Sequence, residues 1–163
     1  MSEALFQSLQ QYASRHELRL GEKLGSGIHG LVHVALKSNV IEKAALKVHQ
    51  SNESYYKECE AYRRLHQASL LQIQGFNVPQ LLGFDDELLI IEMTIVAKPY
   101  LLDFAGVSLD RPAEFSEDVW REWEAEKREQ FGRRWSVVQK VVSGLEVYGI
   151  YLTDVSPSNI AWE

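Results

Sequence analysis

The chain has 163 residues, 45% of them hydrophobic and 25% charged, which fits one folded domain or two small lobes around a single cleft. Its net charge of −6 argues against a broad basic face, so we expect neither a nucleic-acid nor a membrane partner. The single cysteine, Cys59, excludes an intramolecular disulfide and favours a reducing compartment. The sequence shows neither a signal-peptide pattern nor an apolar run long enough for a bilayer, so we expect a cytoplasmic protein.

The first part of the chain predicts a helix followed by an antiparallel meander. Ser2 can cap a helix from Glu3 to about Ser14, which we interpret as a packing or dimer helix. From Leu18 the hydrophobic residues alternate as they do in strands, and Lys37–Asn39 supplies turn residues between the second and third predicted strands. The predicted strands are Leu18–Leu20, Leu31–Leu36 and Ala44–Val48, and a glycine cluster lies at the first turn.

The remainder alternates helices with short strands and loop. A helix is predicted from Ser51 or Asn52 to about Gln67. Two short strands then flank an acidic turn, at Gln80–Gly83 and Leu88–Thr94, and Val96–Phe115 is mostly loop because it contains two prolines and a glycine. A helix beginning at Ser116 is predicted to continue to about Tyr148, with a bend at Gly132.

The pattern Gly25-x-Gly27-x-x-Gly30-x-Val32 is the first signal of chemistry. Glycine lets backbone amides approach phosphate oxygens closely. The same spacing occurs in dinucleotide-binding loops, but those run from a strand into a helix, whereas this one runs from strand into strand. We therefore expect a flap over a nucleotide, with a glycine-rich hairpin that binds no ligand as the alternative.

Lys47 lies in an otherwise apolar strand, where a buried ammonium is costly unless it is paired. A lysine facing solvent is the alternative. On the helix that follows, Glu58 shares a face with Tyr62 and Leu65, whereas Glu60 lies on the solvated side. Periodicity therefore selects Glu58 as the partner of Lys47.

The segment Asp154 to Asn159 is the last signal. An Asp followed five residues later by Asn, on a loop that contains Pro157, can place a general base and a Mg²⁺ ligand in one site. Asp and Asn are also ordinary turn formers, so the segment alone leaves a plain turn open. Earlier in the chain, backbone groups of Glu92–Thr94 at the end of a predicted strand could bind an adenine edge.

Taken in order, these features resemble the protein-kinase-like superfamily: a glycine-rich loop, an Ala-Leu-Lys strand, a helix glutamate and an Asp-x-x-x-x-Asn loop. The resemblance runs from about Leu18 to Glu163 and covers roughly the first half of the family's domain. It implies an α+β fold with a five-stranded antiparallel N-lobe and one helix. The implied organisation is an N-terminal helical extension at 1–17, the N-lobe at 18–95 and a reduced helical C-lobe at 96–163.

The resemblance also implies ATP and Mg²⁺ as cofactors and assigns roles to residues. Lys47 and Glu58 would pair to hold the α- and β-phosphates, Asp154 would accept the proton of the substrate hydroxyl, and Asn159 with Asp154 would bind the metal. The implied nucleotide-binding residues are Gly25, Gly27, Gly30, Val32, Ala45, Lys47, Glu92 and Thr94.

Several departures from the family bear on activity. Thr153 lies directly before Asp154, where the family has an arginine, and Ser156 replaces a lysine that is usual in the family. No Asp-Phe-Gly motif follows Asn159, so we expect Asn159 to hold Mg²⁺ nearly alone, at a large cost in rate. Ile160–Trp162 would form an unpaired strand edge, which we expect the N-terminal helix, a second copy or a protein partner to cover.

Three functions are consistent with this pattern. The first is a minimal phosphotransferase that moves the ATP γ-phosphate to a hydroxyl. The second is a catalytically impaired pseudokinase that acts as a nucleotide- or protein-binding module. The third is a fragment of a longer kinase that is completed by another chain.

Overall fold

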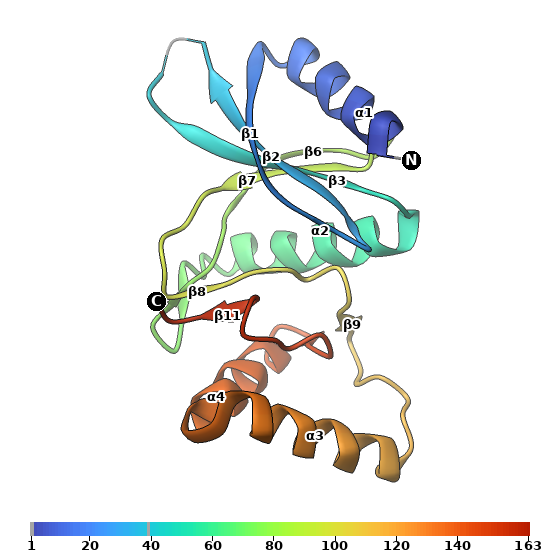
Figure 1. Ribbon diagram of the computed structural model, residues 1–163, viewed down its shortest axis with the longest axis vertical. Coiled ribbons are helices and arrows are strands. Elements are labelled where there is room, and N and C mark those ends of the chain that lie inside the picture. Colours follow the sequence, from blue (N-terminus) through green and yellow to red (C-terminus); the bar gives the residue numbers. More distant parts are fainter. Residues whose placement is uncertain (1, 39) are drawn as a thin grey trace.

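The computed structural model describes residues 2–38 and 40–163, and for Ser2 it describes the backbone alone. The expected cap by the Ser2 side chain and the part of the expected turn at Asn39 therefore lie outside the described residues. The fold is α+β (Figure 1): a β-sheet with helices on both faces forms the upper half, and a smaller, mainly helical half lies below it.

The upper half contains the five-stranded antiparallel sheet that the sequence predicts. The strand order is β1-β2-β3-β7-β6, and every neighbouring pair is antiparallel. The first strand is longer than expected, so it includes Gly25 and Gly27, and Gly30 is the first residue of the second strand. The strands are β1 Leu18–Gly27, β2 Gly30–Lys37, β3 Lys43–His49, β6 Leu81–Asp85 and β7 Ile90–Thr94.

A helix covers each face of this sheet. Helix α1 (Ser2–Arg15) buries Leu9 and Tyr12 against one face, and α2 (Asn52–Gln67) packs on the other. Strand side chains alternate between faces, so Leu46 of β3 packs with α1 while its neighbours in β3 point towards α2. This alternation turns Lys47 towards α2.

Helix α2 begins as predicted. Ser51 is its N-cap, and the Ser51 hydroxyl accepts a hydrogen bond of 3.2 Å from the backbone N–H of Ser54. Glu58 and Tyr62 are buried on the face that packs towards the sheet and the lower half. The helix thereby presents a carboxylate to the region beneath β3.

The loop predicted between Val96 and Phe115 contains two short strands, each of which pairs with a strand near the end of the described chain. A small sheet has the order β11-β8-β5-β4, and β9 pairs separately with β10. The pairs are antiparallel for β11–β8 and β10–β9. The strands are β4 Gln72–Ile73, β5 Phe76–Asn77, β8 Tyr100–Leu101, β9 Ser108–Leu109, β10 Ile150–Tyr151 and β11 Ile160–Ala161.

This pairing corrects the expectation of an unpaired strand at the C-terminal end. Strand β11 pairs with β8 along one side, and the Trp162 ring packs against Phe76 and Phe131. Helix α1 lies on the far side of the large sheet (Figure 1), so it is not the element that covers β11. Cover by a second copy or another protein stays a prediction.

The lower half contains the two predicted helices and the predicted bend. Helix α3 (Glu117–Phe131) has Ser116 as its N-cap. A single 3₁₀ turn, Gly132–Arg134, separates it from α4 (Trp135–Glu146), and Gly132 has a φ of 53°. Among the described residues, no helix is long and apolar enough to span a membrane.

Candidate functional site

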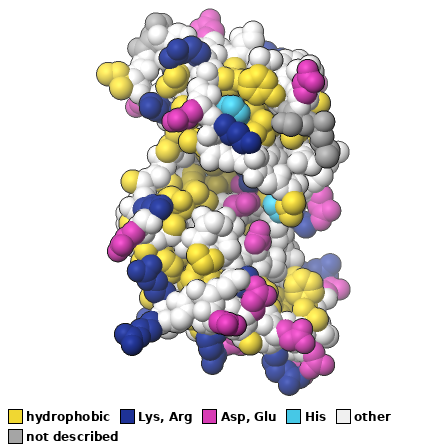
Figure 2. Space-filling view, viewed as in Figure 1, with side chains coloured by type: hydrophobic (Ala, Val, Ile, Leu, Met, Phe, Trp, Pro, Cys, Tyr) yellow, Lys and Arg dark blue, Asp and Glu magenta, His cyan; other side chains and the backbone are white. Residues whose placement is uncertain are grey.

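A cleft of about 600 Å³ separates the sheet from the lower half. Figure 2 shows it as a recess lined partly by hydrophobic side chains. The sequence-predicted residues come to it from the glycine hairpin, from β3, from α2, from the end of β7 and from the loop before β11. Those that line it are Gly25, Gly27, Gly30, Val32, Ala45, Lys47, Glu58, Thr94, Asp154 and Asn159.

Glu92 is the one predicted site residue that does not line the cleft. Its carboxylate accepts a hydrogen bond of 2.9 Å from the hydroxyl of Tyr12 on α1, on the opposite face of the sheet. Thr94 lines the cleft, but its backbone N–H donates to the Gln80 carbonyl, and its hydroxyl accepts from the Gln80 N–H. The backbone that follows β7, at Ile95 and Val96, therefore offers groups to a ligand more readily than Glu92 or Thr94 does.

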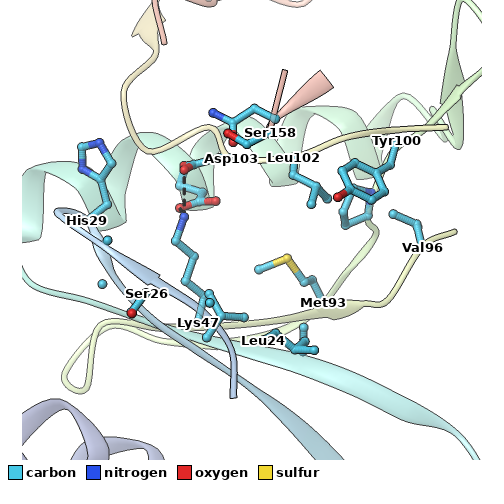
Figure 3. A pocket seen from close by; sticks show the side chains of 18 of the residues that line it. Leu24, Ser26, His29, Lys47, Met93, Val96, Tyr100, Leu102, Asp103 and Ser158 are labelled. Atoms are coloured by element: carbon cyan, nitrogen blue, oxygen red, sulfur yellow. Dashed lines mark hydrogen bonds and ion pairs between the residues drawn. The ribbon is translucent and has the colours of Figure 1, made fainter. Parts of the chain in front are cut away.

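One end of the cleft is apolar. Val32 and Ala45 line it from the sheet, Met93 from the end of β7, and Tyr100 and Leu102 from the segment around β8. Figure 3 shows the Met93, Tyr100 and Leu102 side chains gathered at this end. Such a surface suits a flat apolar group such as a nucleobase.

An ion cluster lies in the middle of the cleft. The Lys47 ammonium is 2.6 Å from Oε2 of Glu58 and 3.1 Å from Oδ1 of Asp103. Figure 3 draws the contact between Lys47 and Asp103 as a dashed line. The Lys47–Glu58 pair that helical periodicity predicts is therefore present. Because Lys47 is 7% exposed and Glu58 is 1% exposed, neither charge could be buried there without the other.

Lys47 and Glu58 favour each other's charged forms. Burial alone would lower the pKa of Lys47, but the neighbouring carboxylates of Glu58 and Asp103 outweigh it and raise that pKa. Burial alone would raise the pKa of Glu58, but Lys47 and a hydrogen bond from His49 lower it to about 2. Lys47 is thus a fixed positive charge that faces the cleft.

His49 is a member of this cluster that the sequence analysis missed. Its Nε2 lies 2.6 Å from Oε2 of Glu58, and its Nδ1 lies 3.1 Å from the Leu89 carbonyl. These two contacts, one to each ring nitrogen, orient the imidazole between α2 and the Leu89 carbonyl. The signal was available, because residues two apart in a strand share a face and His49 follows Lys47 by two.

Asp103 was missed because it lies in the predicted loop. Its φ of 66° is left-handed, a conformation that Asp tolerates and that is concentrated at functional sites. Its Oδ1 accepts from the Ala105 N–H at 3.2 Å as well as from Lys47. The next residue, Phe104, donates its N–H to Glu58 at 3.4 Å and packs its ring against Tyr62. The sequence contains the dipeptide Asp103-Phe104, but Ala105 rather than Gly follows it, so no motif marked Asp103 in advance.

The loop that carries Asp154 is fixed from two sides. The Thr153 hydroxyl donates to the Gly106 carbonyl at 2.8 Å, and the Thr153 carbonyl accepts from the indole N–H of Trp123 at 2.9 Å. The Asn159 amide donates to the Asp154 carbonyl at 3.4 Å. Asp154 itself is exposed at the cleft, where it can meet an incoming group.

The cleft carries two carboxylates and an amide on its lower side. Asp103, Asp154 and Asn159 all line it, so the cleft has a second carboxylate that the sequence analysis did not anticipate, and the way in which Asn159 would hold Mg²⁺ stays a prediction. Mg²⁺ is commonly held by one or two carboxylates together with substrate phosphates, so this donor set fits that ion. Within the described residues, no three Asp, Glu, His or Cys side chains form a group that could hold a metal by themselves.

No protein-family model matches this chain, and no curated protein matches its sequence. A function is therefore inferred from the geometry of the cleft.

Proposed function

We propose that this chain is a kinase-like phosphotransferase that binds ATP with Mg²⁺ and moves the γ-phosphate to a hydroxyl acceptor. One observation carries the proposal: a buried, fixed cation, Lys47, faces the same cleft as the glycine hairpin, Asp103, Asp154 and Asn159. These groups come from segments far apart in the chain. A structural ion pair alone would not require them to meet.

The two ends of the cleft suggest how the nucleotide lies. The base would occupy the apolar end beside Met93 and Tyr100, where the backbone of Ile95 and Val96 can bind its edge. The phosphates would lie under the glycine hairpin and beside Lys47. In this orientation the charged part of the ligand meets the charged part of the cleft.

Each residue then has a physical role. Lys47 neutralises phosphate oxygens, and Glu58 holds Lys47 in place because it is buried and hydrogen-bonded on both carboxylate oxygens. Asp154 accepts the proton of the acceptor hydroxyl. Asp103 and Asn159 would hold Mg²⁺, which neutralises phosphate charge when it is bound.

The position of Asp103 in the chain differs from the kinase-like pattern that the sequence resembles. There the Asp-Phe-Gly motif follows the Asp-x-x-x-x-Asn loop, whereas Asp103-Phe104 precedes Asp154 here. The pairing of β8 with β11 and of β9 with β10 supports the same use of the segment, because it holds Asp103 beside that loop. We infer that a segment earlier in the chain supplies the metal-binding carboxylate.

Nucleotide binding is tested by thermal unfolding and calorimetry with ATP and Mg²⁺. At an ATP concentration of about 100 times Kd, binding should stabilise the protein by about 3 kcal/mol. Lys47→Met should abolish this gain, whereas Lys43→Met, on the exposed start of the same strand, should keep it. Because Lys47→Met also breaks a buried pair, its folding is checked by circular dichroism without ligand. The proposal fails if ATP binds wild type and a folded Lys47→Met equally well, or binds neither.

Turnover is tested with radiolabelled ATP, with water as the basal acceptor. Asp154→Asn should lower phosphate release by about 10²- to 10⁴-fold while ATP binding stays the same. Asp103→Asn should lower both turnover and the dependence of ATP binding on Mg²⁺. Asp118→Asn, an exposed control on α3, should leave all three measurements unchanged.

A nucleotide-binding module without turnover is the second candidate. The observation that favours it is that the described part of the chain holds no cluster of metal-binding side chains sufficient by itself. Mg²⁺-dependent binding together with release that is unchanged in Asp154→Asn would select this candidate.

A further inference from the structure

The tip of the glycine hairpin is a two-residue turn, Ile28–His29, between the paired residues Gly27 and Gly30. Ile28 and His29 both line the cleft, but Ile28 is 83% exposed whereas His29 is half-buried. Figure 3 shows His29 at one end of the cleft, beyond Lys47 and far from Met93 and Val96. The imidazole is therefore at the end opposite the apolar part.

The position of this turn is set by the fold. The His29 carbonyl accepts a hydrogen bond of 3.1 Å from the Gln50 N–H, and the Gln50 side chain donates to the Gly27 carbonyl at 3.3 Å. A Cβ atom on Gly30 would lie 1.9 Å from the Val48 carbonyl oxygen, so the hairpin lies closer to β3 than any other residue would permit. The turn is thus held over the cleft by contacts with β3 and with the residue that follows it.

His29 comes down towards Asp154. A Cβ atom placed on Gly106 would lie 4.0 Å from Nε2 of His29 and 3.4 Å from Cβ of Asp154. Gly106 therefore lies near both residues, which both line the cleft. A group bound beside Gly106 would lie near His29 and Asp154 together.

Positive charge is scarce in the cleft. Of the described residues that line the cleft, Lys47 is the only lysine and none is an arginine. Lys47 is already shared between Glu58 and Asp103. His29 is the other lining residue that can donate an N–H and carry a positive charge beside an anion.

We propose that His29 binds the terminal phosphate of a nucleoside triphosphate, so that the cleft selects ATP over ADP. This inference rests on the proposed function, because it presumes the nucleotide orientation given there. The phosphates nearer the base meet Lys47, and only the third phosphate extends far enough to meet His29 beside Asp154. A hydrogen bond to a charged phosphate is among the stronger protein hydrogen bonds, and it is lost entirely when that phosphate is absent.

The test is calorimetric titration of ATP and ADP, each with Mg²⁺, into wild type, His29→Ala, His29→Lys and Ile28→Ala. Removal of the imidazole should weaken ATP binding about tenfold or more and ADP binding less than about twofold. His29→Lys should restore most of the preference for ATP. Ile28→Ala, on the same turn, should leave the ratio of the two affinities unchanged because its side chain has no N–H to donate, and thermal melts should show that all variants fold.

Each other outcome is informative. If His29→Ala leaves the ratio of the ATP and ADP affinities unchanged, whether or not both are weakened, the role of His29 is overturned. The proposed function would still stand if ATP binding depended on Lys47. A similar change of this ratio in Ile28→Ala would show that the turn rather than the imidazole matters, which also overturns the inference. Wild type that binds neither nucleotide would overturn both proposals.

Discussion

The carboxylate of Glu58 is the group whose replacement tests the ion cluster most directly. Glu58→Gln keeps the shape of the side chain but removes the charge shared by Lys47 and His49. The variant leaves Lys47 buried with Asp103 as its remaining partner. We expect a large loss of stability, because a buried charge that loses one partner is poorly compensated.

The size of the loss follows from the pKa of Glu58. A pKa lowered from 4.5 in the unfolded chain to about 2 in the fold corresponds to a stabilisation on the order of 3 kcal/mol at neutral pH. Breaking a buried ion pair by removing one partner costs about 3–5 kcal/mol, which agrees. Since domains are stable by about 5–15 kcal/mol in total, the variant should fold but with little reserve.

The sign of the pH dependence is fixed, because the pKa is lower in the folded state. The contribution of Glu58 is complete above about pH 4.5 and is lost as the pH falls towards 2. Urea unfolding of wild type, Glu58→Gln and the surface control Glu60→Gln should show this. Glu60 pairs with Arg64 near solvent, so its loss should cost about 1 kcal/mol or less. A difference between wild type and Glu58→Gln below about 1 kcal/mol at pH 7, or one that does not shrink in acid, would refute this account.

Three further predictions concern the glycine hairpin, the loop that carries Asp154 and the contacts of Arg64 between the upper and lower halves. Gly30→Ala should destabilise the protein by about 2 kcal/mol or more, measured by urea unfolding, because its Cβ would collide with the Val48 carbonyl, whereas Gly25→Ala meets no atom within 4 Å and should not. Trp123→Phe removes the donor to the Thr153 carbonyl and should lower phosphate release more than ATP affinity. Arg64→Ala should lower the free energy of unfolding by about 1–3 kcal/mol, because Arg64 ties α2 to Asp110 and to the Tyr148 and Gly149 carbonyls.

Local pattern was enough to predict the upper half of the fold. Alternation and turn residues located the strands of the large sheet, and the caps at Ser51 and Ser116 begin their helices as expected. Helical period also identified Glu58, because burial of a carboxylate on the core side of α2 required a cation, and Lys47 was the one within reach. Strand alternation, helix caps and helix faces depend on residues that are close in sequence, so one sequence is enough to predict them.

Asp103 could not be located in this way. Its place is set by strands of two residues each, β8 and β11, which pair across a separation of about sixty residues. Strands so short carry almost no periodicity, so the sequence does not indicate which segment each will meet. Glu92 was expected at the cleft because the resemblance implied it, although the alternation of β7 turns its side chain towards Tyr12.

The position of Asp103 bears on whether the cleft could support turnover. The order of the motifs along the chain does not point to Asp103 as a metal-binding carboxylate, because Asp103 precedes Asp154 and Asn159. In space, a carboxylate from an earlier segment lies against Lys47 and lines the same cleft as Asp154 and Asn159. Phosphoryl transfer depends on where charges lie and not on the order in which the chain supplies them. If Asp103 supplies that carboxylate, as proposed, the main chemical objection to turnover is met, and Asp103→Asn becomes the variant that best separates a phosphotransferase from a binding module.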